Sequence, residues 1–194
     1  MSDHYLPTLD QVREFVIAGH GDLHKVQAML ADCPTLLNAA YEWKENDIET
    51  AIQGAAHIGN VAVAEFLLAQ GASLEICTAA MLGRIPDVEQ LLRNDPNLIH
   101  ATGAHSISLL THAALSGNLA LVELLAQRGA QAGLTSALHN AVSNGYEAIV
   151  RWCLMNGQPD LDWRNFQGRT ALAVAKQRQD ENIVQLLQAH GATE

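Results

Sequence analysis

Nine histidines are the residues of this 194-residue chain best suited to chemistry, because a neutral imidazole can act as a base or bind a metal. His20 and His24 have H-x-x-x-H spacing, but a glycine follows His20 where a zinc protease needs glutamate. His100, His105 and His112 match no recognised metal-ligand spacing. We therefore predict no metal site and no cofactor, and expect most histidines to form hydrogen bonds with backbone carbonyls.

Cys33, Cys77 and Cys153 are widely spaced and form no C-x-x-C pair, which excludes a zinc ribbon and a thioredoxin-like motif. Nucleophilic catalysis needs a thiol beside a base, and Cys77 could pair with His57 or His105 across a groove. The plainer alternative is that all three thiols are small hydrophobic side chains in a core.

Four carboxylates, from Glu42, Glu45, Asp47 and Glu49, lie close together, and a solvated acidic loop accounts for them. The chain contains no G-x-x-x-x-G-K-[ST], G-x-G-x-x-G or G-x-S-x-G motif, so it has no signature of a nucleotide-binding enzyme or a serine hydrolase. We therefore predict that the protein is not an enzyme.

Charge and hydropathy exclude two further classes of partner. The chain has 21 acidic and 11 basic residues, a formal net charge of −10, whereas nucleic-acid binding needs many Lys and Arg contacts. No uncharged apolar run approaches the roughly 18 residues of a membrane span. The acidic start without an apolar stretch predicts no secretory signal, and together with free thiols it favours a cytoplasmic location.

An internal repeat positions these side chains. A marker glycine stands at positions 21, 59, 83, 117 and 145, Gln179 takes its place in a sixth unit, and the spacings are 38, 24, 34, 28 and 34 residues. Apolar residues five and eight positions after each marker indicate one buried helix face. A second short helical stretch, rich in small residues, precedes each marker. The unit is therefore a helix, a tight turn and a helix.

This unit resembles the ankyrin repeat, whose signature is a β-turn finger, T-P-L-H-x-A and two antiparallel helices over about 33 residues. The matching segments are NFQGRTALAVA (165–175) and SALHNAV (136–142). LLRNDPNLIHA (91–101) is similar to the repeats of many bacterial ankyrin-repeat proteins. The resemblance implies an all-α, ankyrin-type solenoid of about six helix–turn–helix repeats.

The spacings leave room for three β-turn fingers, at 38–49, 100–107 and 162–169. We expect one domain over 1–194, with a lead-in to the N-terminal cap at 1–9. The expected repeats are 10–39, 40–74, 75–101, 102–134, 135–160 and 161–194.

In such a fold the ends of the inner helices and the fingers form a concave surface, and here that surface is unusually apolar and aromatic. The expected function is recognition of a protein or peptide partner there, by a monomer or weak homo-oligomer. The predicted contact residues are Tyr41, Trp43, His57, Ile58, Met81, Leu82, His105, Leu115, Trp163 and Phe166.

Three alternatives remain open from the sequence. In the first, the apolar side chains bind no partner and simply fill gaps between repeats where fingers are short. In the second, they are buried against a second copy of the chain. The protein could also be a small-molecule binder or unusual enzyme, with a pocket under the first fingers formed by His57, Cys77 and His105.

Overall fold

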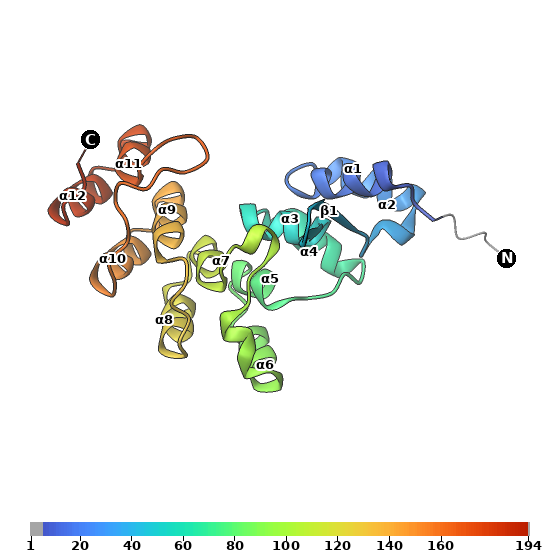
Figure 1. Cartoon of the computed structure of the whole chain (residues 1–194), viewed down its shortest axis with the longest axis horizontal. Helices are drawn as coiled ribbons and strands as arrows, with labels where there is room; N and C mark the ends of the chain where they lie inside the picture. Colours follow the sequence, from blue (N-terminus) through green and yellow to red (C-terminus); the bar gives the residue numbers. More distant parts are fainter. Residues whose placement is uncertain (1–5, 194) are drawn as a thin grey trace.

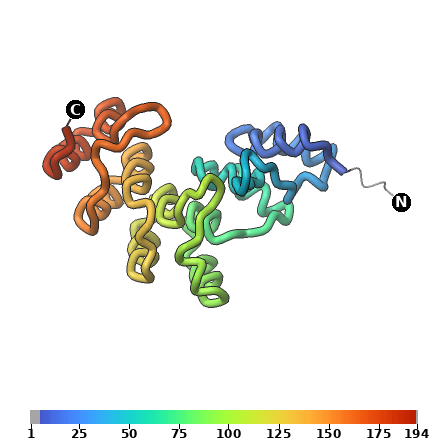
Figure 2. Tube along the Cα trace, viewed as in Figure 1, coloured from blue at the N-terminus to red at the C-terminus, as the bar shows by residue number. Residues whose placement is uncertain are grey.

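The described residues of the computed structural model, 6–193, form six consecutive helix pairs (Figure 1). The pairs follow one another along an elongated molecule with α1 and α12 towards opposite ends (Figure 2). The helices are α1 Leu9–Gly19, α2 Leu23–Asp32, α3 Ala51–Ile58, α4 Val61–Ala69, α5 Ile76–Met81, α6 Ile85–Asn94, α7 Leu109–Leu115, α8 Leu119–Gln127, α9 Leu134–Asn144, α10 Glu147–Met155, α11 Ala171–Arg178 and α12 Glu181–Ala189. Residues 1–5 of the expected lead-in lie outside the described residues.

The odd-numbered helices form an inner row, in which each contacts the next one along the chain. Local sequence sets where these helices begin and end. Thr50 and Gln53 form a reciprocal capping box at the start of α3, and Thr8 and Gln11 form the capping box that the sequence pattern predicts at the start of α1. At the end of α11, Gln179 adopts the left-handed conformation (φ 59°) that the marker glycines at 59, 83, 117 and 145 also adopt.

The three fingers occur where the sequence predicts them. The first is an antiparallel hairpin of β1 (Ala40–Lys44) and β2 (Asp47–Thr50). The second contains the short 3₁₀ helix η3 (Ala104–Ser106) and is closed by a bridge between Thr102 and Ser108. The third is a turn in which the Asn165 amide donates to the Arg169 carbonyl. Two further 3₁₀ helices, η1 (Pro34–Leu36) and η2 (Pro96–His100), follow α2 and α6.

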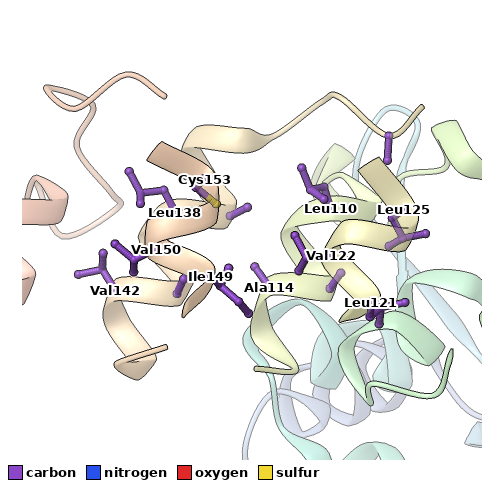
Figure 3. Packing of buried hydrophobic residues seen from close by; sticks show 14 of the residues in the cluster. Leu110, Ala114, Leu121, Val122, Leu125, Leu138, Val142, Ile149, Val150 and Cys153 are labelled. Carbon is purple, nitrogen blue, oxygen red and sulfur yellow. The ribbon is translucent and has the colours of Figure 1, made fainter. Parts of the chain in front are cut away.

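Two hydrophobic clusters form the core. The first is built mainly on α1 to α4, and the second extends from α5 to α12. Figure 3 shows side chains of the second cluster on two successive helix pairs, among them Leu110 on α7, Leu125 on α8 and Leu138 on α9. Because each repeat buries its apolar face only against its neighbours, stability is distributed along the stack.

Cys77 lies in this core rather than in a groove. It stands two residues after the Glu75 N-cap of α5, which is the leucine position of the T-P-L-H pattern, and its exposure is 4%. Burial raises the pKa of Cys77 and that of Cys153 to about 12. The alternative of a nucleophilic pair between Cys77 and a histidine is therefore wrong, since a buried neutral thiol is neither accessible nor activated, and Cys77 is the small core side chain of the plainer prediction.

Within residues 6–193, no helix combines the length and apolar content needed to cross a membrane.

Candidate functional site: a groove and a histidine cluster

A groove of about 1050 Å³ runs along the inner row, between the second and third fingers. Its walls come from α3, α7 and α9 and from both fingers. Its lining contains histidine, asparagine, serine and apolar residues, but no Lys, Arg, Asp or Glu. The groove is therefore a surface without Lys, Arg, Asp or Glu side chains on an acidic protein.

Six of the ten predicted contact residues line this groove. They are His57, Ile58, His105, Leu115, Trp163 and Phe166. Phe166 stands at the tip of the third finger and is 95% exposed. Trp163 contacts His139 edge to face with ring centroids 4.8 Å apart, and His139 Nε2 donates to the Trp163 carbonyl. This contact holds the third finger against α9.

The other four predicted residues do not line the groove. Met81 is 1% exposed and belongs to the first hydrophobic cluster, which Leu82 also contacts. The expectation that Met81 is available on the concave surface is therefore wrong, because it is buried in the core, whereas Leu82 is partly buried against the same cluster.

Tyr41 and Trp43 lie on one face of β1, as their spacing predicts, but that face packs against the first hydrophobic cluster. Their rings meet edge to face at 4.9 Å, and Trp43 Nε1 donates to Glu49 Oε2 at 2.6 Å. Trp43 therefore binds its own finger to the first two repeats.

A polar cluster lies at one end of the groove. It combines His20 at the C-cap of α1, Glu49 on β2, His57 on α3 and His105 on η3, and their ligand atoms all lie within 4.8 Å of one another. No sequence pattern indicates this cluster, because its members come from three different repeats. The expectation of a solvated acidic loop is wrong for Glu49 and Asp47, whose side chains are 0% and 11% exposed.

In two of the histidines, the Nδ1 atom, which points away from the centre of the cluster, already forms a hydrogen bond. His20 Nδ1 donates to the Val16 carbonyl at 3.0 Å, and His105 Nδ1 donates to Asp47 Oδ2 at 2.9 Å. A neutral imidazole that donates through Nδ1 carries a lone pair on Nε2. In their neutral forms, both rings therefore carry on Nε2 a lone pair that faces the buried Glu49 carboxylate, and a cation between these atoms removes the repulsion.

The charges of the cluster are coupled. Burial by itself raises the pKa of Glu49, but contacts with His20, His57 and Trp43 outweigh it and lower this pKa to about 2. The Glu49 carboxylate in turn raises the pKa of His20 against the effect of burial. Glu49 is thus ionised, and the cluster favours positive charge at its centre.

His112, behind the second finger, is instead held neutral. Burial lowers its pKa to about 4, against the hydrogen bond that Nδ1 donates to the Ser108 carbonyl. An unfolded chain binds this proton near pH 6.5, so stability contributed by neutral His112 is present above pH 6.5 and is lost as the pH falls towards 4. Between pH 7 and pH 5, the free energy of unfolding in urea should fall by about 2 kcal/mol more for the wild type than for His112→Asn.

Asparagine keeps an amide donor for Ser108 but does not titrate, and the opposite contribution of His20 is common to both proteins. Identical pH dependence of wild type and His112→Asn would show that His112 does not titrate in this range.

A family model for three consecutive ankyrin repeats matches residues 76–158 and 110–193, and a model for a single ankyrin repeat matches residues 47–79. A search of curated proteins found no significant match. The three-repeat matches alone span 76–193, which is more than half of the chain and contains the helix pairs from α5 to α12. The chain therefore belongs to the ankyrin-repeat family.

Proposed function

We propose that this protein is a non-catalytic binding module whose groove takes an extended peptide segment of a protein partner. Ankyrin repeats are generally protein–protein interaction modules. The observation that carries the proposal is a long groove without Lys, Arg, Asp or Glu side chains, with a fully exposed aromatic side chain, Phe166, at its rim.

The chemistry of the lining favours an uncharged segment with at least one large apolar side chain. Ile58 and Leu115 supply an apolar patch at one end, and Trp163 and Phe166 supply aromatic surface at the other. Between them, side chains of α9 such as Asn140 and Asn144 can pair with the amides of an extended backbone. A charged segment would lose hydration without finding a partner charge in the lining.

Phe166→Ala should weaken binding of a groove peptide at least about tenfold, as expected for an aromatic interface anchor. The melting temperature should stay unchanged, because a side chain that is 95% exposed contributes little to packing. Peptides selected from a random phage-displayed library on wild-type protein provide the probe, and calorimetric titration measures their affinity for each variant.

Met155→Ala is the matched control, since Met155 is 71% exposed on α10 but lies outside the groove lining. Selected peptides that bind Phe166→Ala as tightly as they bind wild type would place recognition elsewhere. Failure to enrich any peptide would also contradict the proposal.

The enzyme alternative under the first fingers loses its nucleophile, because Cys77 is buried in the core. The buried thiols of Cys77 and Cys153, which form no disulfide, support a cytoplasmic location as part of the proposal. We further propose that the whole chain acts as one domain, as a monomer or weak homo-oligomer. Its mass in solution, measured over a range of concentrations, tests this.

A further inference from the structure

The histidine cluster contains a buried carboxylate, which peptide binding in the groove does not require. Glu49 is 0% exposed, and among the described residues no hydrogen bond of normal geometry reaches its Oε1 atom. Oε1 nevertheless lies 3.0 Å from His57 Nε2 and 3.4 Å from His20 Nε2. A buried carboxylate oxygen among imidazole nitrogens is costly unless a cation is shared between them.

A proton satisfies only part of this arrangement. His57 Nε2 and His20 Nε2 are 3.0 Å apart, so one proton can join those two nitrogens or join one of them to Oε1. That proton does not reach His105 Nε2, which lies 3.6 Å from Glu49 Oε2 and faces the same centre. A single metal cation can accept all four side chains at once.

The distances agree with a small tetrahedral ion. Ligands about 2.0–2.1 Å from a tetrahedral Zn²⁺ stand about 3.3–3.4 Å from one another. The three contacts among His20, His57 and Glu49 Oε1 range from 3.0 to 3.4 Å. His105, with a side chain that is 35% exposed on a finger, needs only a small movement to complete the set.

The surroundings match those of a metal site. Metal-binding histidines usually donate their second nitrogen to a carbonyl or carboxylate, as His20 does to Val16 and His105 does to Asp47. A Cβ atom on Gly54 would lie 3.0 Å from the His20 ring. Glycine at this position therefore makes room for the ring in the cluster.

We propose that His20, His57, His105 and Glu49 form a structural site for a divalent transition-metal ion, with Zn²⁺ as the ion that its nitrogen-rich, tetrahedral donor set fits best. Four protein ligands close the coordination sphere, which is typical of structural rather than catalytic zinc. The ion joins α1, α3 and the second finger. It therefore links the first hydrophobic cluster to the repeats of the second and fixes a wall of the groove. The proposal does not depend on what the groove binds.

The test is a titration of the full chain, freed of metal by a chelator, with Zn²⁺ by calorimetry and with Co²⁺ by visible absorption. We expect one equivalent of Zn²⁺ to bind with a dissociation constant of about 1 µM or tighter, in the manner of structural sites. Co²⁺ should give the intense visible bands of tetrahedral coordination. Zn²⁺ should raise the melting temperature, because only the folded chain presents the site.

His105→Ala should weaken Zn²⁺ binding about 100-fold or more, and Asp47→Asn about 10-fold, since losing an outer partner alone costs about 10–100-fold. His24→Ala is the matched control, because His24 is exposed on α2 and belongs to no cluster. His105→Ala removes a side chain on a finger, so it should remain folded even if a change at buried Glu49 does not.

Three results would overturn the proposal. One is a wild-type protein that binds Zn²⁺ no more tightly than His105→Ala does. Another is stoichiometric binding that His24→Ala abolishes but His105→Ala retains. The third is a melting temperature that Zn²⁺ leaves unchanged, which would make the cluster a network held by protons.

Discussion

Leu125→Ala should destabilise the protein by about 3–5 kcal/mol, as for other large-to-small changes at fully buried positions. Leu125 lies on α8 with 0% exposure, in the cluster shown in Figure 3. The substitution leaves a cavity between neighbouring repeats, where each repeat has no other apolar surface to pack against. Urea unfolding followed by circular dichroism measures the loss.

Leu9→Ala provides the comparison, because Leu9 is 69% exposed on α1 and should change stability by less than about 0.5 kcal/mol. If the two variants unfolded at the same urea concentration, Leu125 would not belong to a core that carries the stability of the stack.

Gly19→Ala should cost about 3 kcal/mol through overpacking. A Cβ atom on Gly19 would lie 2.4 Å from the Ala51 carbonyl oxygen and 2.7 Å from the Ala51 Cα. These are backbone atoms, so no side chain can rotate to relieve the clash and α1 must move away from α3. The melting temperature and the urea midpoint of the variant report this loss.

Gly21 offers a control two residues away, since a Cβ atom there has nothing within 4 Å. Gly21→Ala should leave stability within about 0.5 kcal/mol of wild type. Equal tolerance of alanine at both positions would mean that α1 and α3 do not pack as closely as the structure has them.

The repeat, its helices and its three fingers were accessible from the sequence because their causes are local. Apolar residues at helical spacing, the capping pair Thr8 and Gln11, and the marker glycines each act within one or two turns of chain. The expectation that histidines form hydrogen bonds with backbone carbonyls holds at His139, whose Nε2 donates to the Trp163 carbonyl on the third finger.

The surface was less predictable, because burial depends on how neighbouring repeats fit together. Ile58 and Leu115 stand at equivalent inner-helix ends to Met81 and Leu82, yet the first two line the groove and the other two lie in or against the core. Similarly, Tyr41 and Trp43 have the spacing of one strand face, but only packing decides whether that face turns to a partner or to the core.

The amino-acid sequence by itself determined that this protein is a stack of helix pairs with three fingers and no enzyme motif. Only the tertiary structure brought His20, Glu49, His57 and His105 within 4.8 Å of one another, across 85 positions of the chain. No spacing rule contains such a cluster, because its geometry arises from the rotation of one repeat against the next. The same stacking buries Glu49 and exposes Phe166, and so positions the side chains of the proposed metal and peptide sites.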